Sequence, residues 1–346
     1  MLFRSVHIDN YDNGIHYSNK LGGLGLTFKD SPTILKKIGL DHADKVVAVS
    51  PSFLLECEFA KPEAPNSVRT MAIAFKQAKL NHKSVGITNG FDFKKYNHFL
   101  NDNFSNSYIH TKNRLKSKLK FELSGSRGLW TINPHLPIIL FIGRYSPEKG
   151  VNSFTKLIYL LEKNAHIKAN FIAIGRGYHP EVMELILKKS RQQANVFVTL
   201  DQNEQDKYGP LMRACADFMF IPSYREACGL ISLEGLANGA LCISSGAGGL
   251  KDIVQEISQD LNQGNGFIYN HLIENSLEQV LIRAIGFWNQ MDESKKNKLC
   301  QRLIEDSKKF DWAFSEGPSK IYHQIYSSAL EDSYTENRSA EPLKIA

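Results

Sequence analysis

The sequence predicts an α/β protein built on a parallel, doubly wound sheet with helices on both faces. From residue 137 onward, short apolar runs alternate with helical patterns, which is typical of parallel strands covered on both sides. The charged and glycine-rich motifs follow directly after predicted strands. Ligands of such sheets bind at the carboxyl ends of the strands, so we expect the functional site at that edge.

The expected elements follow in order along the chain. Strands are predicted at residues 45–49, 85–88, 137–142, 170–174, 196–200, 217–221, 240–244 and 266–268. Helices are predicted after Ser50-Pro51, around 114–123, and at 152–164, 180–192, up to 215, 230–238 and 250–257.

The domain organisation predicted from these patterns has four parts. They are a first domain at 1–93, a hinge or insertion at 94–136, a second domain closed by a C-terminal helix at 137–330, and a disordered tail at 331–346.

Composition excludes several classes of protein. No apolar run approaches the roughly 18 residues of a membrane span, and the N-terminal residues lack the apolar segment of a signal peptide, so we expect a cytoplasmic protein without a membrane partner. The five cysteines are scattered and lack zinc-site spacing, so they are interpreted as reduced thiols and no metal is expected.

The net charge of +6 is mild and suits a small anionic ligand. The densest basic stretch, residues 112–120, is interpreted as a solvated helix face. A nucleic-acid patch there is the alternative, but no nucleic-acid partner is expected.

The first motif follows the strand PIILFI and contains Gly143, Arg144 and Lys149. Two cations at the carboxyl end of a strand can neutralise a diphosphate, and a guanidinium fork matches phosphate oxygens. When a sugar leaves a nucleoside diphosphate, negative charge grows on the leaving phosphate. Fixed cations stabilise that charge more than they stabilise the ground state. Two surface cations on a loop are the alternative interpretation.

The second motif holds two carboxylates, Glu226 in a loop and Glu234 in the helix that follows, with Gly229 at the turn between them. This spacing allows one carboxylate to reach a sugar ring while the other accepts hydrogen bonds from a ribose. An unrelated loop acid and helix acid would give the same spacing.

The third motif is a glycine turn between a strand and a helix, which includes Gly248 and Gly249. Glycines at a helix N-terminus let backbone N–H groups approach a phosphate. Gly175, in Gly175-Arg176-Gly177, marks a similar turn that could border the nucleotide base. Either turn could also be only a turn.

Together, these motifs resemble the C-terminal domain of bacterial glycogen and starch synthases, which are retaining glycosyltransferases with the GT-B fold of two Rossmann-like domains. The resemblance rests on FIGRYSPEKG, MRACADFMFIPSYREACGLISLEGLANGA, GAGGLKDIV and KKFDWAFSEGPSKIYHQIY, and upstream on ADKVVAVSPSF and GITNGFDFKKYN. It implies one complete C-terminal Rossmann-like domain and a partial N-terminal one.

The resemblance also implies roles for individual residues. Arg144 and Lys149 would bind the donor phosphates, Glu226 the donor sugar and Glu234 the ribose. The other implied donor contacts are Gly143, Cys228, Gly229, Leu230, Gly248 and Gly249. No metal or other cofactor is implied, because the two cations take the place of a metal ion. Front-face attack is implied, with the leaving phosphate taking the acceptor proton.

The chain departs from the family pattern in four respects. The family usually has proline at the position of Ala227. The family's His-Asn segment matches SVHIDNYDNG only with two residues between His7 and Asn10, and in that alignment the resemblance implies that His7 is a catalytic residue that approaches the donor sugar from the N-terminal domain. Most of the N-terminal domain that precedes this segment in the family is missing. Lys20-Leu21-Gly22-Gly23-Leu24 has the spelling of the family's donor loop but stands out of order, so it is interpreted as a flexible turn.

Three functional hypotheses follow. The first is a retaining transferase that moves a hexose, foremost glucose, from ADP-glucose or UDP-glucose to a glycan acceptor. The second is a nucleotide-sugar-binding remnant with little activity alone, or one part of an enzyme that a second chain completes. The third is a protein-modifying transferase with another donor such as GDP-mannose. The partial first domain also predicts that residues 1–90 are poorly ordered, prone to aggregation or covered by a partner.

Overall fold

The computed structural model describes residue 40 and residues 43–59, 66–99, 107–124, 132–177 and 180–339. The chain divides into two compact units, Met1–Thr88 with Pro318–Ala346, and Asn89–Gly317. The boundary after Thr88 lies within the first expected domain. Helix α14 (Pro318–Ser339) groups with the first unit, although it was expected to close the second, and it continues past residue 331, where a tail was expected.

The second unit is built on a six-stranded, all-parallel sheet in the order β5-β4-β3-β6-β7-β8. This is the order of a doubly wound sheet, in which the chain winds outward in one direction from β3 and in the other from β6. The parallel α/β prediction is therefore confirmed. The strands are β3 (Ile138–Ile142), β4 (Asn170–Ile174), β5 (Val196–Thr199), β6 (Phe218–Ile221), β7 (Leu241–Ser244) and β8 (Gly266–Ile268).

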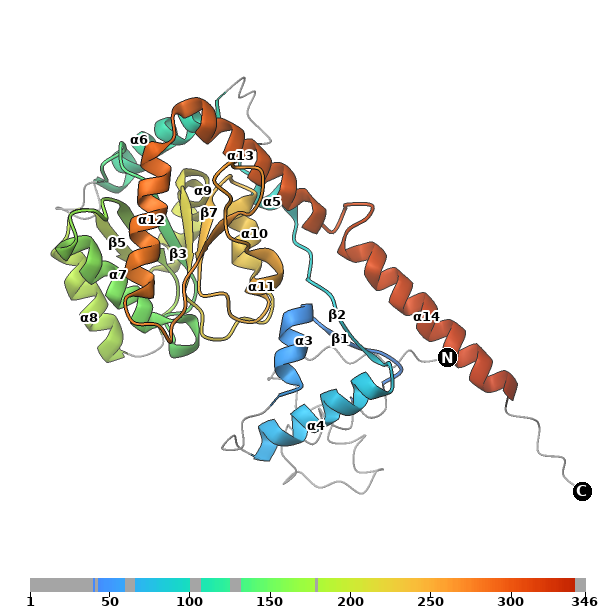
Figure 1. Ribbon diagram of the computed structural model, residues 1–346. Helices are drawn as coiled ribbons and strands as arrows, with labels where there is room; N and C mark the ends of the chain where they lie inside the picture. Colours follow the sequence, from blue (N-terminus) through green and yellow to red (C-terminus); the bar gives the residue numbers. More distant parts are fainter. Residues whose placement is uncertain are drawn as a thin grey trace, which may run out of the picture. The chain divides into compact units, whose positions relative to one another are not determined.

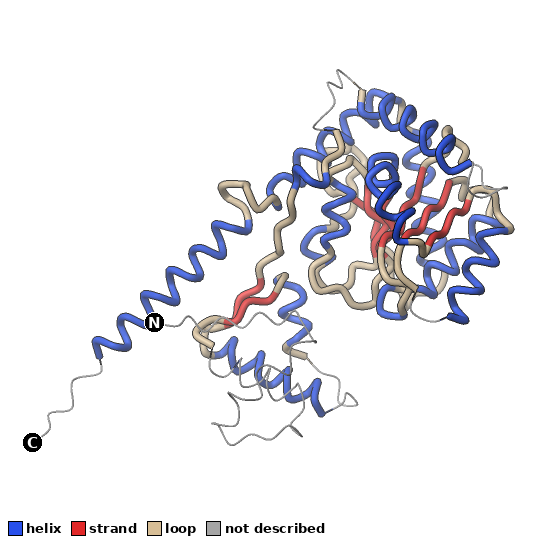
Figure 2. The backbone as a smooth tube through the Cα atoms, turned by 180° about the vertical axis from the view of Figure 1, so that it is seen from behind, coloured by secondary structure: helices blue, strands red, loops and turns tan. Residues whose placement is uncertain are grey.

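Helices cover both faces of this sheet (Figures 1 and 2). One face carries α7 (Val151–Lys163), α8 (Pro180–Arg191) and α12 (Ser276–Gln290). The other carries α6 (Tyr108–Ser124), α9 (Gln202–Cys215), α10 (Leu230–Leu236) and α13 (Glu293–Ser307). The short helices α5 (Phe93–Tyr96) and α11 (Leu250–Ile253) complete the unit, together with the 3₁₀ turns η2 (Pro147–Lys149) and η3 (Lys308–Phe310).

Aromatic side chains fill the space between the sheet and α7. The ring of Phe154 lies 5.5 Å from that of Phe141 and 5.0 Å from that of Phe171, measured between centroids. All three side chains are almost fully buried. The apolar runs of the sequence became buried strands because both faces of the sheet are covered.

The structure corrects the expectation that residues 112–120 form a solvated helix face. Lys118 and Lys120 are exposed, but Lys112 and Lys116 are buried. Lys112 Nζ donates to the carbonyl of Ala216, and Lys116 Nζ lies 2.6 Å from Asp217 Oδ2. Two lysines four residues apart share the inner face of α6, and the acceptors at the start of β6 compensate for their burial.

The first unit contains a parallel pair of short strands, β1 (Val46–Ala48) and β2 (Ser84–Gly86). Helix α3 (Pro51–Cys57) begins as its sequence predicts, because Ser50 Oγ accepts a hydrogen bond from Phe53 N and proline occupies the first turn. Helix α4 (Asn66–Leu80) contributes Ala74 and Ala78 to a small core.

Candidate functional site

The candidate site lies where the winding of the second unit reverses, between the neighbouring strands β3 and β6. The loops after these two strands pack backbone to backbone. Tyr224 N donates to Glu148 O over 2.8 Å, and a Cβ atom on Gly150 would lie 1.9 Å from Pro222 O. A crevice outside the carboxyl ends of such strands is the usual ligand position in this architecture.

Lys149 and Glu226 meet at this point. Lys149 Nζ lies 2.6 Å from Glu226 Oε2, and Ser223 Oγ donates to the same oxygen over 2.9 Å. The side chain of Lys149 is 26% exposed and that of Glu226 is 13% exposed. An ammonium group has three N–H donors. Lys149 can therefore hold the carboxylate and still offer donors to an anionic ligand.

Arg144 lies on the same loop as Lys149 but pairs with a different acid. Its Nη2 is 3.1 Å from Glu148 Oε1, and its side chain is 60% exposed. An exposed ion pair of this kind contributes little to stability. The guanidinium can therefore exchange Glu148 for a phosphate at small cost.

The glycine turn after β7 packs against the loop that carries Glu226. Gly249 N donates to Glu226 O over 2.9 Å, and a Cβ atom on Gly249 would lie 2.6 Å from Ala227 O. Gly248 is buried beside it. Only glycine allows this approach of two backbones, so the turn fixes the loop of Glu226.

The turn between the two carboxylates needs a glycine as well. Gly229 has φ 90° and is the residue that precedes α10, a conformation that other residues adopt only with strain. Leu230 opens the helix with a 39% exposed side chain. Cys228 is buried, and burial raises the pKa of its thiol to about 11.

Glu234 lies on α10, where it pairs with Arg213 of α9. Arg213 Nε is 2.7 Å from Glu234 Oε2, and both side chains are mostly buried. Burial raises the pKa of Glu234, and the guanidinium of Arg213 opposes that rise. The sequence motif indicated the carboxylate but not its partner.

Gly175 directly follows β4 and lies beside Gly143, which directly follows β3. Gly143 N donates to Ile174 O over 3.1 Å, and a Cβ atom on Gly175 would lie 1.7 Å from Gly143 O. The two glycines therefore allow the start of the Arg144 loop to pack closely against the end of β4.

An aromatic and imidazole cluster next to Glu226 was missed in the sequence. The ring of Tyr224 stacks on that of His271 with centroids 4.1 Å apart, and His271 Nε2 lies 3.3 Å from Ser223 O. Since a carbonyl only accepts, that contact places the ring proton on Nε2. Ser223, Tyr224 and His271 all follow strand ends within three residues, a positional signal that would have found them.

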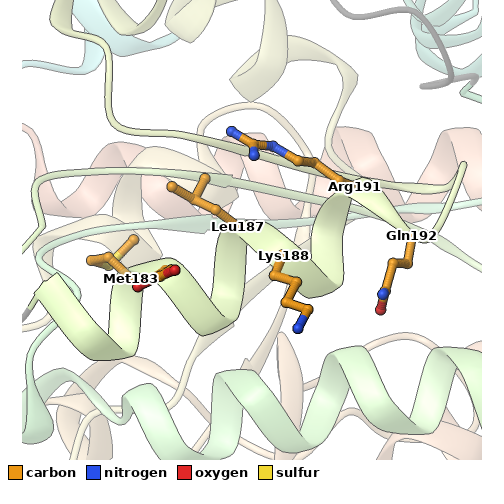
Figure 3. A pocket seen from close by; sticks show the side chains of 6 residues that line it. Met183, Leu187, Lys188, Arg191 and Gln192 are labelled. Atoms are coloured by element: carbon orange, nitrogen blue, oxygen red, sulfur yellow. The ribbon is translucent and has the colours of Figure 1, made fainter.

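A separate cavity lies on α8, away from these residues. It has a volume of about 720 Å³ and is lined by one helix and the residue that follows it, through Met183, Glu184, Leu187, Lys188, Arg191 and Gln192. Leu187 and Arg191 point to one side of the helix, whereas Lys188 and Gln192 point to the other (Figure 3). Its polar groups do not converge as those of a binding site do.

His7 and the Lys20–Leu24 turn lie outside the described residues, as does about half of the segment 1–90, which was expected to be poorly ordered, prone to aggregation or covered by a partner. Within the described part of the chain, no group of three or more His, Cys, Asp and Glu residues could hold a metal ion. In that same part, no helix combines the length and apolar character that crossing a membrane requires.

Residues 127–309 match the family model described as glycosyl transferases group 1. The chain belongs to this family. Glycogen synthase 1 of Synechococcus sp. strain JA-3-3Ab is 28% identical over 84% of the chain and 56% of its own length. The group 1 domain thus contains every described residue of the site.

Solved structures share the fold of this group 1 chain. The catalytic domain of starch synthase IV from Arabidopsis thaliana superposes with a TM-score of 0.68 at 22% identity, covering 86% of this chain and 58% of that one. Anabaena HepE superposes with a TM-score of 0.52 at 18% identity, over 86% of this chain and 69% of that one. The chain spans a little more than half the length of the curated relatives it matches.

Proposed function

We propose that this group 1 glycosyl transferase binds a nucleoside diphosphate sugar between β3 and β6 and transfers its hexose, foremost glucose, to a glycan with retention of anomeric configuration. The observation that carries this proposal is the contact between Lys149 and Glu226 where the sheet reverses its winding. It places a cation and a carboxylate beside the glycine turn of Gly249.

Each part of the site has one role in this proposal. Arg144 and Lys149 bind the diphosphate and stabilise the charge that develops on it as the sugar leaves. Glu226 accepts hydrogen bonds from sugar hydroxyls, and Glu234 accepts one from the ribose. This chemistry needs no metal ion, because the two cations neutralise the leaving group.

Two solved relatives support the ligand class. The starch synthase IV structure contains ADP and acarbose, and a HepE structure contains UDP and glucose. We therefore propose ADP-glucose or UDP-glucose as donor and an α-glucan as acceptor. A partner chain, if one completes the first unit, would act on the acceptor side.

A thermal-shift series tests the donor proposal. The chain is melted with ADP-glucose, UDP-glucose and GDP-mannose, each beside its free nucleotide. A ligand that binds only the native state at about 100 times its Kd adds about 2.7 kcal/mol of stability. A rise in melting temperature with only one donor identifies that donor as the substrate. No shift with any of them, in a protein that melts cooperatively, contradicts the proposal.

A transfer assay tests the reaction. Radiolabelled donor that gave the shift is incubated with glycogen, and label in the precipitated polymer is measured, followed by digestion with an α-specific glucosidase. We expect label that this enzyme releases. If the donor binds but none of the glucans tried becomes labelled, the chain binds the nucleotide sugar without transferring its hexose.

A further inference from the structure

Arg213 is held on several sides in the second unit. Its Nε donates to Glu234 Oε2 over 2.7 Å, and its guanidinium carbon lies 5.8 Å from the centre of the Tyr96 ring. A Cβ atom on Gly209 would lie 3.1 Å from its Nη1, so the backbone of α9 passes close by. The side chain therefore has little freedom to leave the carboxylate.

The segment that carries Tyr96 is itself fastened to α10. Asn238 Nδ2 donates to Tyr96 O over 2.7 Å and to Glu234 O over 2.9 Å, while Asn238 Oδ1 accepts from His98 N over 3.2 Å. The side-chain amide of Asn238 thus links the segment of Tyr96, which packs against Arg213, to α10, the helix of Glu234. The guanidinium, the ring and the carboxylate form one fixed assembly.

We propose that Arg213 is a positioning residue of the donor site, which engages Oε2 of Glu234 and holds the other carboxylate oxygen ready to accept hydrogen bonds from the ribose. This inference rests on the proposed function, since it concerns the ribose of the same donor. It adds a requirement: Glu234 recognises the ribose through the carboxylate oxygen that Arg213 does not engage.

The charges around Glu234 support this role. Arg213 faces the carboxylate from α9 and Lys95 from α5, and both lower its pKa against the larger, opposite effect of burial. His98 also faces Arg213, and its pKa is lowered by burial and by that guanidinium. Arg213 is therefore the group that most strongly opposes the effect of burial on the pKa of Glu234.

The first experiment measures the ionisation of Glu234 directly. The carboxyl carbons are observed by NMR in protein labelled with ¹³C-glutamate, and the signal is assigned with Glu234→Gln. We expect Arg213→Met to raise the midpoint by about 1–3 pH units, the usual effect of losing an opposite charge. Arg213→Lys should restore most of the difference. Lys207→Met, on the exposed face of the same helix, should change nothing. An unchanged midpoint in Arg213→Met overturns the inference.

The second experiment uses the wild-type chain and is independent of how the variants fold. Calorimetry compares ADP, 2′-deoxy-ADP and 3′-deoxy-ADP, with the UDP series alongside. We expect at least one deoxynucleotide to bind about tenfold more weakly than its parent, because Glu234 loses a hydrogen bond from the ribose. If both deoxynucleotides bind as tightly as their parent, the inference that Arg213 positions Glu234 for the ribose is overturned. If neither ADP nor UDP binds at all, the proposed function fails, whatever the NMR midpoint shows.

Discussion

Gly249 N donates a hydrogen bond to Glu226 O over 2.9 Å, and this contact joins the glycine turn after β7 to the loop of the candidate sugar-binding carboxylate. The two backbones are so close that a methyl group at residue 249 would lie 2.7 Å from the Cα of Cys228. The geometry of the site therefore depends on the absence of a side chain at this one position.

Gly249→Ala should destabilise the chain and weaken donor binding, because the added methyl group forces the two loops apart. Overpacking of this kind costs about 1–3 kcal/mol. The matched control is Gly286→Ala in α12, where an added Cβ has nothing within 4 Å. That change should stabilise the chain by about 0.5–1 kcal/mol through helix propensity. Urea unfolding compares the two, and equal effects would refute the close packing.

Lys116→Met should destabilise the second unit strongly. It leaves Asp217, whose side chain is 1% exposed, without its ion-pair partner, and breaking a buried pair costs about 3–5 kcal/mol. Lys118→Met on the same helix removes an exposed lysine and should change stability by less than about 0.5 kcal/mol. Thermal unfolding of both proteins measures the difference. If Lys116→Met lowers the thermal stability only slightly, the ion pair with Asp217 does not hold α6 against the sheet.

The thiols should resist modification in the folded protein. Burial raises the pKa of Cys228 and Cys300 to about 11 and that of Cys215 and Cys242 to about 12. A thiol with a pKa of 11 is ionised in about one molecule in a thousand at pH 8. We expect a disulfide reagent to react slowly with native protein, first at the partly exposed Cys57, and with all five thiols after denaturation. Fast reaction of Cys228 would contradict its burial.

His271 should make the folded state sensitive to acid. Burial lowers its pKa below the ordinary value, so the unfolded chain binds the proton more readily than the folded one. Its stabilising effect is complete above the unfolded pKa and is lost as the pH falls through about 6.5 to the lower folded value. His271→Phe keeps a ring against Tyr224 and should reduce the decline of Tm between about pH 7 and pH 5. An unchanged decline would assign the acid sensitivity to other groups.

Much of the second unit could be predicted from sequence, because its strands are short apolar runs and four of the six are followed directly by glycine, proline or serine. Strand β4 agrees with the prediction residue for residue, and β8 does as well. The order of the strands could not be predicted, since it depends on contacts between distant segments. The meeting of Lys149 with Glu226 was therefore visible only in the structure.

Several other features of the second unit could not be predicted from the sequence patterns. Helices α12 and α13 were not predicted. Helix α11 ends at Ile253, whereas the expected helix extended to residue 257. The burial of Lys112 was missed because a lysine is ordinarily exposed, and only the carbonyl of Ala216 explains its position. Arg213 was missed because nothing near it in sequence marks a partner for Glu234.

The most direct test of the central claim is calorimetric titration of UDP-glucose and ADP-glucose into the wild-type chain, Lys149→Ala and Lys163→Ala. Lys163 ends α7 as an exposed lysine paired with Glu162, so its variant controls for the loss of one positive charge. We predict that one donor binds the wild type and Lys163→Ala equally and binds Lys149→Ala at least about tenfold more weakly, as expected for a lost charged hydrogen bond. Equal affinity of Lys149→Ala and wild type would contradict the account.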